Sequence, residues 1–144
     1  FYLNGLKPIS SDKVLHYWRD YPTRTSRTDE NYADNTFLEI KTDYFLKLEY
    51  NKEKSLVVWG AGDKGKSLAQ RLINENIDFY WICDNPNKIG KEIYNKKLLS
   101  FEELNTIKNS QSIITVANMK AQDEIKTFFK ERNSVQNVDY FFFC

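Results

Sequence analysis

From residue 55 to the end of the chain, short apolar runs alternate with longer stretches in which apolar residues recur at helical spacing. The apolar runs are rich in branched and aromatic residues and end at glycine or polar residues, which is typical of buried β-strands. Strands are therefore expected over residues 55–59, 78–82, 97–99, 112–117 and 138–143. Helices are expected between them, over residues 64–74, from residue 100 onward and around residues 121–129.

The start of the second of these helices has local signals of its own. Ser100 and Glu103 have the spacing of a capping box, in which each side chain bonds a backbone N–H of the other residue. Leu99 and Leu104 have the spacing of a hydrophobic staple. Both signals predict that a helix begins at Ser100.

Strands that alternate with helices predict right-handed βαβ units and a parallel sheet. The strands are apolar on both faces, which agrees with a sheet that helices cover on both sides. The predicted fold class is α/β, a Rossmann-like doubly wound parallel sheet of about five strands in the spatial order 3-2-1-4-5. An irregular and then helical N-terminal segment precedes it.

The first part of the chain is polar and irregular until a helical pattern begins near Thr36. Thr36 and Glu39 have the capping-box spacing that would start this helix. Its apolar residues share one expected inward face, which comprises Phe37, Ile40, Tyr44, Phe45 and Leu48. We expect residues 1–51 to form a tail and helical connector and residues 52–144 to form the Rossmann-like domain. The alternatives for the first part are partial disorder and docking on that domain through Tyr44, Phe45 and Leu48.

Composition narrows the classes of protein to consider. The 144 residues carry a net charge of +1, which argues against binding nucleic acid or an anionic membrane by bulk charge. No apolar run approaches the roughly 20 residues that span a bilayer, and no secretory signal opens the chain. We expect a cytoplasmic location. The alternative is a location at the inner face of the membrane, to which the longer parent protein would bring this chain. Because the first residue is Phe1 rather than Met, we expect either a fragment of a longer protein or a trimmed chain.

A metal site is not expected. Cys83 and Cys144 are the only cysteines, and they form no CxxC pair. His16 is the only histidine, and it lies in the irregular first part of the chain. Cys83 follows an apolar run and is interpreted as a buried apolar residue.

The chemistry-bearing motif is a glycine turn between the first predicted strand and the helix after it. Its sequence is Gly60-Ala61-Gly62-Asp63-Lys64-Gly65, a GxGxxG pattern in the context that the dinucleotide fingerprint requires. Gly60 permits the tight turn, Gly62 lets a pyrophosphate approach the backbone, and Gly65 lets the helix pack against the strand. The helix start offers N–H groups and a positive dipole end to a phosphate, and Lys64 or Lys66 is expected to add charge. The expected ligand is NAD or a nucleotide sugar.

Two polar residues follow later strands at the same edge of the sheet. Asp84 ends the second strand, where a carboxylate would accept hydrogen bonds from a ribose and would favour NAD over NADP. Asn118 follows the fourth strand and is expected beside the ligand. The alternatives are that Asp63 only caps the helix, that Asp84 only nucleates a turn, and that the pocket is empty and serves folding or assembly.

A redox enzyme is the second hypothesis. Hydride transfer needs a substrate site with an acid or base near the nicotinamide, and neither His16 nor Asn118 provides one. The alternative is therefore a fragment of an NAD-dependent oxidoreductase whose substrate domain lies elsewhere. A methyltransferase shares the glycine turn and the acid at the second strand, but no residue here identifies a methyl acceptor.

Residues 16–27 resemble the segment that closes the catalytic domain of family 2 glycosyltransferases. In that family an aromatic–Arg pair, here Trp18 and Arg19, precedes a proline and a serine, here Pro22 and Ser26. The resemblance implies donor-contact roles for Arg19 and Ser26. The chain has Asp20-Tyr21 where a histidine before the proline is common in the family.

Residues 57–117 resemble the nucleotide-sugar-binding domains of bacterial sugar acyltransferases and of other polysaccharide-biosynthesis proteins. The shared features are the Gly-Ala-Gly turn and an Asp-Asn-Pro element, here residues 84–86, followed by Gly90. Together the two resemblances imply an accessory domain behind a glycosyltransferase catalytic domain, acting in cell-surface polysaccharide synthesis. The chain contains no Asp-x-Asp metal motif, so the fragment is not expected to be catalytic alone. The aromatic strand of residues 140–143 is interpreted as core, with homodimer pairing at a sheet edge as the alternative.

Overall fold

The computed structural model describes residues 4–6, 9, 11–24 and 36–144, and contacts divide the chain into two compact units, residues 1–33 and 34–144. Residues 11–24 of the first unit contain no helix or strand. A turn closes at its end, where the Arg24 N–H donates to the Tyr21 carbonyl at 3.2 Å and the Arg24 guanidinium lies 4.3 Å from the Trp18 ring centroid. Large apolar side chains of this unit are exposed: Leu6, Ile9, Val14, Leu15, Tyr17, Trp18 and Tyr21.

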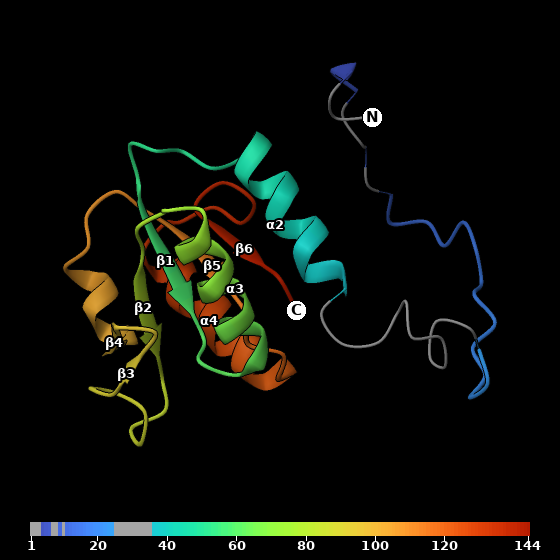
Figure 1. The fold of residues 1–144 in the computed structure, drawn as a ribbon. Helices are drawn as coiled ribbons and strands as arrows, with labels where there is room; N and C mark the ends of the chain where they lie inside the picture. Colours follow the sequence, from blue (N-terminus) through green and yellow to red (C-terminus); the bar gives the residue numbers. More distant parts are fainter. Residues whose placement is uncertain (1–3, 7–8, 10, 25–35) are drawn as a thin grey trace. The chain divides into compact units, whose positions relative to one another are not determined.

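The second unit is a mixed α/β domain in which strands alternate with helices along the chain (Figure 1). In chain order they are α2 (Thr36–Leu48), β1 (Ser55–Trp59), α3 (Asp63–Asn74), β2 (Tyr80–Cys83), β3 (Glu92–Ile93), β4 (Lys96–Ser100), the 3-10 helix η3 (Phe101–Asn105), β5 (Ser110–Ile114), α4 (Met119–Glu131) and β6 (Tyr140–Phe142).

The sheet has six strands in the order β3-β4-β2-β1-β5-β6, and every pairing except β3 with β4 is parallel. The five predicted strands take the predicted order, which confirms the Rossmann-like fold class. The additional strand β3 forms a hairpin with β4 through Tyr94 and Asn95, whose φ angles are 54° and 59°. Left-handed backbone at both positions makes the tight turn that hairpins favour, but a tyrosine there gives little signal in the sequence.

Helices cover both faces of the sheet and bury two apolar clusters. One face packs against α2 and α3, and the other against η3 and α4. Val58, Trp81 and Ile113 face the first cluster, while Val57, Ile82 and Ile114 face the second. This alternation along strands that are buried on both sides is the reason for their continuous apolar runs.

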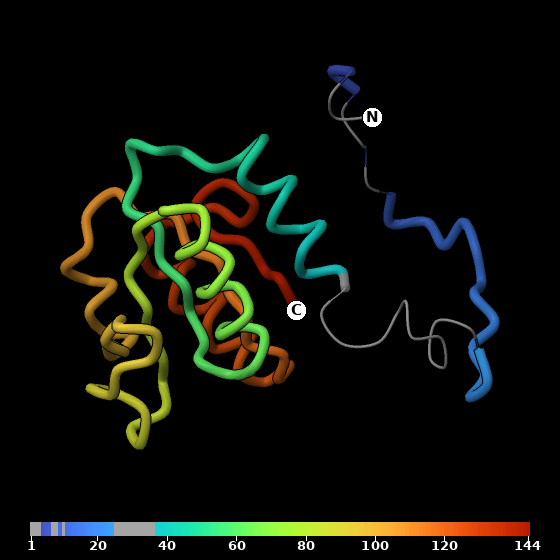
Figure 2. Tube along the Cα trace, viewed as in Figure 1, coloured from blue at the N-terminus to red at the C-terminus, as the bar shows by residue number. Residues whose placement is uncertain are grey.

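Helix α2 packs on the domain by a different face from the one we expected. Its fully buried side chains are Leu38, Thr42 and Phe45. The trace of α2 runs beside the C-terminal strand (Figure 2), where the Phe45 ring lies 5.0 Å from Phe141 and 5.9 Å from Phe143 between centroids. The expected inward residues other than Phe45 are 36–53% exposed: Phe37, Ile40, Tyr44 and Leu48.

The physical reason for this error is that α2 is apolar on two faces. The Thr42 hydroxyl donates to the Leu38 carbonyl at 2.7 Å, so a polar residue can be buried at no cost in hydrogen bonding. On the neighbouring side of the helix, Asp43 pairs with Arg71 of α3 at 2.8 Å. Aromatic contacts to β6 then select the face with Phe45. Docking through Phe45 is confirmed, whereas docking through Tyr44 and Leu48 is wrong.

Two further expectations are corrected or confirmed by the packing. The helix predicted from Ser100 is the short 3-10 helix η3, in which the Ser100 hydroxyl accepts from the N–H of Glu102 rather than of Glu103. Its Leu104 is fully buried, so one turn suffices to place that side chain before β5 begins at Ser110.

The interpretation of the last aromatic stretch as core is confirmed. Tyr140, Phe141 and Phe143 are only 6–8% exposed, although β6 is an edge strand. Among the described residues, no helix is long and apolar enough to cross a bilayer.

Candidate functional site

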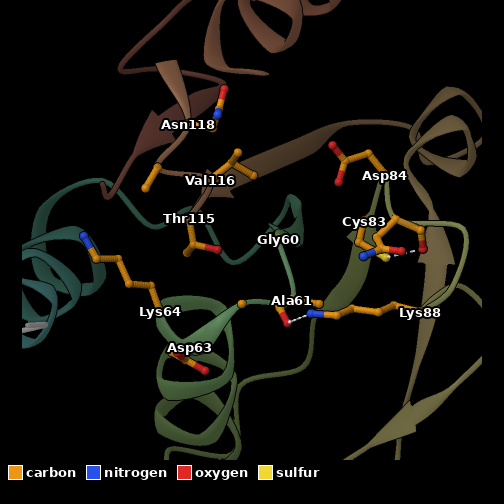
Figure 3. A pocket seen from close by; sticks show the side chains of 13 residues that line it. Gly60, Ala61, Asp63, Lys64, Cys83, Asp84, Lys88, Thr115, Val116 and Asn118 are labelled. Carbon is orange, nitrogen blue, oxygen red and sulfur yellow. Dashed lines mark hydrogen bonds between the residues drawn. The ribbon is translucent and has the colours of Figure 1, made fainter. Parts of the chain in front are cut away.

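A cavity of about 590 Å³ lies at the carboxyl ends of β1, β2 and β5. This is the edge of an open parallel sheet where ligands of such folds bind, at the point where the strand order reverses. It is lined by Gly60, Ala61, Gly62, Asp63, Lys64, Cys83, Asp84, Asn85, Lys88, Thr115, Val116, Ala117 and Asn118 (Figure 3). Six of the seven residues predicted for this site line the cavity, and Gly65 is the exception.

Gly60 makes the tight turn out of β1. Its φ of 121° is strained for any residue with a side chain, and a Cβ there would lie 2.5 Å from the Thr115 hydroxyl oxygen. Its N–H donates to the Ile82 carbonyl at 2.9 Å, and its own carbonyl accepts from the Trp81 indole N–H at 2.8 Å. The floor of the cavity is therefore held rigidly by the neighbouring strand.

Gly65 lies behind the turn and outside the cavity lining. A Cβ at Gly65 would lie 2.1 Å from the Gly60 carbonyl oxygen and 3.0 Å from the Thr115 hydroxyl oxygen. The first turn of α3 can therefore rest on the backbone of the glycine turn only because this residue has no side chain. The predicted packing role of Gly65 agrees with this geometry.

Gly62 is the N-cap of α3 and faces open space. Its backbone is extended, with φ −82° and ψ −170°, and no side chain caps the helix. A Cβ at Gly62 would meet no heavy atom within 4 Å. The first backbone N–H groups of α3 are therefore left without a side-chain acceptor beside the cavity, and such groups bind anions at helix starts.

Lys88 was missed by the sequence analysis and lies over the glycine turn. Its ammonium donates to the Ala61 carbonyl at 2.8 Å, as Figure 3 shows. The Trp81 and Lys88 donors thus engage the Gly60 and Ala61 carbonyls, so the turn presents N–H groups rather than bare carbonyls to the cavity. The only hint in the sequence was a lysine four residues after Asp84, in the loop that follows β2.

The two charged residues at the start of α3 do not act alike. The Asp63 side chain is 96% exposed and lies 3.9 Å from the Lys66 ammonium, so Asp63 does not cap the helix. Lys64 is half-buried and lines the cavity, but its side chain extends away from Ala61 and Lys88 (Figure 3). The exposed Asp63 carboxylate leaves the N–H groups of the turn accessible.

Asp84 directly follows β2 and is exposed at the cavity wall. The turn after it is closed by Asn85, whose side-chain oxygen accepts from the Asn87 N–H at 2.9 Å and whose carbonyl accepts from the Lys88 N–H at 2.9 Å. Within the described part of the chain the Asp84 carboxylate accepts no hydrogen bond. It is therefore available to a ligand rather than consumed by the turn.

Asn118 lines the cavity and also has a structural role. Its side-chain oxygen accepts from the Ala121 N–H at 3.0 Å, which makes it the N-cap of α4. Its amide nitrogen donates no hydrogen bond within the described residues. Thr115, on the opposite wall from β2, donates its hydroxyl to the Trp59 carbonyl at 3.1 Å and supports the strand end.

Cys83, the cysteine of the cavity wall, is not an activated nucleophile. Burial raises the pKa of the Cys83 thiol, and the nearby Asp84 charge acts in the same direction, so the thiolate is disfavoured. Across the residues that the structure describes, no three His, Cys, Asp or Glu side chains gather as metal ligands would. Arg19 is exposed in the first unit, and Ser26 lies outside the described residues.

Comparison with known proteins identifies the fold but no family. No family model matches the chain, and no curated protein matches it. Among solved structures, it is similar to RSP, a Rex-family repressor, with 16% identity and a TM-score of 0.51 over 74% of this chain and 53% of that one. The structure of RSP in complex with β-NADH gives a TM-score of 0.50, with the same identity and coverage. The chain thus spans about half the length of that repressor, and the likeness establishes a Rossmann-like fold.

Proposed function

We propose that the domain of residues 36–144 binds a nucleotide whose phosphates lie on the turn from Gly60 to Gly65. The observation that carries the proposal is the start of α3, which has no side-chain cap and lies beside the cavity. The space in front of its N-cap residue Gly62 is open, since a Cβ added there would meet no heavy atom within 4 Å. Unsatisfied N–H groups and the positive end of the helix dipole together favour a phosphate at this place.

The hydrogen bonds around the turn support an anion rather than a neutral polar group. The Gly60 and Ala61 carbonyls, which would repel a phosphate, are both occupied by donors from neighbouring elements. The Lys88 donor brings a positive charge to within 2.8 Å of the Ala61 carbonyl oxygen. A phosphate on the turn therefore meets N–H groups and an ammonium, which bind it by charge-assisted hydrogen bonds.

Asp84 supports a nucleotide over a simple phosphate. Its carboxylate faces the same cavity from the end of β2, where it can accept hydrogen bonds from the hydroxyl groups of a ribose. A carboxylate at this position repels a 2′-phosphate. The proposal therefore includes discrimination against NADP and similar 2′-phosphorylated ligands.

The ligand class we favour is a nucleotide sugar or its nucleoside diphosphate, bound by a domain that is not itself catalytic. The support is the resemblance of residues 57–117 to nucleotide-sugar-binding domains, together with a cavity lined by no histidine and by a disfavoured thiolate. In this proposal the parent protein is a glycosyltransferase of cell-surface polysaccharide synthesis, and residues 1–33 belong to the end of its catalytic domain.

A second candidate ligand is NAD or NADH. The specific observation in its favour is that the Rex-family repressor with a similar fold was solved in complex with β-NADH. In that case the chain would be part of an NAD-dependent oxidoreductase or another NADH-responsive protein. The GxGxxG turn and Asp84 fit both ligands, so binding must separate them.

The test is a thermal-shift and calorimetric panel with UDP, GDP, UDP-glucose, NAD, NADH, NADPH and S-adenosylmethionine. A ligand at a hundred times its dissociation constant should stabilise the domain by about 2.7 kcal/mol. Gly62→Val should fold normally, because its backbone angles suit any residue, and should lose the shift, because the side chain fills the phosphate position. NADPH should bind more weakly than NADH.

A matched pair of lysine variants tests the anion site separately. Lys88→Met should weaken binding about tenfold, since it removes a charge-assisted hydrogen bond from the turn. Lys91→Met, an exposed lysine of the same loop that does not line the cavity, should bind as the wild type does. No shift with any compound, or equal effects of the two variants, would overturn the proposal.

A further inference from the structure

Helix α2 has a second apolar face that the domain leaves exposed. Ile40, Tyr44 and Leu48 are spaced by one turn each, so they lie in a line along about 12 Å of the helix. Their exposed fractions are 53%, 52% and 36%. Another side of α2 packs on the domain, where α3 and β6 lie beside it (Figure 1). We call the line of these three side chains the outer stripe.

Two lysines flank the outer stripe. Lys41 and Lys47 come one before and one after Tyr44, each at a distance of three residues in the sequence. With about 3.6 residues per turn, each lies about 60° round the helix from Tyr44, and the two lie on opposite sides of it. Both lysines are exposed, and within the described residues neither has an ion pair. The apolar stripe therefore has an ammonium group on each side.

The acidic residues of α2 lie away from the stripe, on the side of α3. Asp43 pairs with Arg71 of α3 at 2.8 Å. Glu39 lines a small cavity between the two helices together with Arg71. Both carboxylates thus lie beside a cation of the domain itself. The outer side of α2 is left with apolar and basic side chains only, which suits an anionic and partly apolar partner.

The size of the outer stripe argues against a second copy of the chain as that partner. Three half-exposed side chains offer roughly 300 Å², whereas a stable protein–protein interface buries about 800 Å² per partner. Two copies that met on this stripe about a two-fold axis would also bring the Lys41 and Lys47 of both copies around one seam. Repulsion between like charges disfavours such a contact.

A lipid surface fits the same features without a large or shaped interface. An amphipathic helix lies in the plane of the membrane interface with its apolar side in the headgroup region, where a tyrosine ring is also favoured. Lysine stems lie along the apolar surface while their ammonium groups reach the headgroups, and anionic lipids attract them. The net charge of +1 makes attraction by bulk charge weak, so this attraction is local to α2.

We infer that the outer stripe of α2, with Lys41 and Lys47, attaches the domain to an anionic lipid surface. The attachment is peripheral and reversible, because only three apolar side chains enter the headgroup region. Leu38 and Phe45 stay buried against the domain, so α2 binds lipid without leaving its place. This inference goes beyond nucleotide binding and does not depend on it.

The test is co-sedimentation of the whole chain with lipid vesicles. One set of vesicles contains equal parts of phosphatidylglycerol and phosphatidylcholine, and the other contains phosphatidylcholine alone. The wild type should bind the anionic vesicles, with an affinity about tenfold higher than for the neutral ones. Raising the salt concentration should weaken this binding, since salt screens the charges of exposed lysines.

Two double variants separate the apolar and the basic parts of the surface. Ile40→Gln with Tyr44→Gln removes apolar area, and Lys41→Gln with Lys47→Gln removes both charges. These positions are exposed and glutamine is a good helix former, so both variants should fold as the wild type does. Each should lower the affinity for anionic vesicles about tenfold. Nucleotide thermal shifts should be the same in both variants as in the wild type.

Lys120→Gln with Lys130→Gln is the matched control. It removes the same charge from exposed positions of α4, which covers the other face of the sheet, and should bind vesicles as the wild type does. Three results would each overturn the inference: no binding of the wild type to anionic vesicles, binding that neither α2 variant weakens, or an equal loss in the control. A dimer in analytical ultracentrifugation that the Ile40→Gln and Tyr44→Gln variant dissociates would also overturn it, by assigning the stripe to a second copy.

Discussion

Replacing Gly65 by alanine should damage the domain far more than replacing Gly62, although both glycines belong to the same motif. A Cβ at Gly65 would lie 2.1 Å from the Gly60 carbonyl oxygen and 2.8 Å from its carbon, both backbone atoms. Real contacts of a Cβ do not fall below 3.0 Å, so α3 and the turn must move apart by about 1 Å. At Gly62 the added atom meets nothing within 4 Å.

The magnitude follows from what the displacement breaks. Overpacking a well-packed site costs about 1–3 kcal/mol, and the clash at Gly65 is with backbone that cannot swing away. The displaced Gly60 carbonyl also weakens its buried hydrogen bond from Trp81, and an unpaired buried group costs about 1–3 kcal/mol. We expect Gly65→Ala to lower the free energy of unfolding by about 3 kcal/mol. Gly62→Ala should lower it by about 0.5 kcal/mol, because alanine is a poorer N-cap than glycine.

Urea unfolding followed by tryptophan fluorescence measures both values, since Trp59 and Trp81 are buried in this domain. With a urea dependence of about 2 kcal/mol/M, the midpoint for Gly65→Ala should fall by about 1.5 M. The midpoint for Gly62→Ala should fall by about 0.25 M. Equal midpoints for the two variants, or a Gly65→Ala midpoint close to the wild type, would refute the reasoning that Gly65 serves close packing and Gly62 serves the ligand.

Two further predictions concern the face of α2 and the acid stability of the domain. Phe45→Ala should lower the free energy of unfolding by about 3–5 kcal/mol. Tyr44 is 52% exposed, so Tyr44→Ala should change the free energy of unfolding by less than about 0.5 kcal/mol. Urea unfolding measures both values, and similar losses for the two variants would support the face expected from the sequence. Burial opposes ionisation of Asp139, but hydrogen bonds from Lys54 and the Val135 N–H outweigh it and lower the pKa of Asp139. A lowered pKa gives stability that is present above the ordinary aspartate pKa and is lost as pH falls through the folded value. Asp139→Asn should therefore be less stable than the wild type at pH 7 and should lose less stability between about pH 4 and pH 2. Urea midpoints measured across this pH range test the prediction, and parallel pH profiles for the variant and the wild type would contradict it.

The elements that the sequence predicted well are those whose signals are local. Strand positions and helices α3 and α4 follow from apolar runs and helical spacing, because the central strands β1, β2 and β5 are buried on both faces. The glycine turn is also local, since Gly60 needs a positive φ and Gly65 needs the absence of a Cβ. Six of the seven predicted site residues line one cavity for the same reason: strand ends of a parallel sheet meet at one edge.

The glycosyltransferase assignment is a prediction from sequence resemblance. It rests on the resemblance of residues 16–27 and 57–117 to segments of other proteins, and it stays a prediction. Of the two donor-contact candidates, Arg19 is exposed and Ser26 lies outside the described residues. Ligand binding by the domain can be measured without reference to it.

The sequence by itself determined the α/β class, the strand order and the geometry of the glycine turn, because these depend on backbone conformation and on which residues lack a side chain. The tertiary structure decided which of two apolar faces of α2 is buried, because that choice depends on Phe141 and Phe143, almost a hundred residues away. It also brought Lys88 of the loop after β2 to the Ala61 carbonyl of the glycine turn. Such contacts join residues distant in the chain, and their energies depend on three-dimensional neighbours that no local pattern specifies.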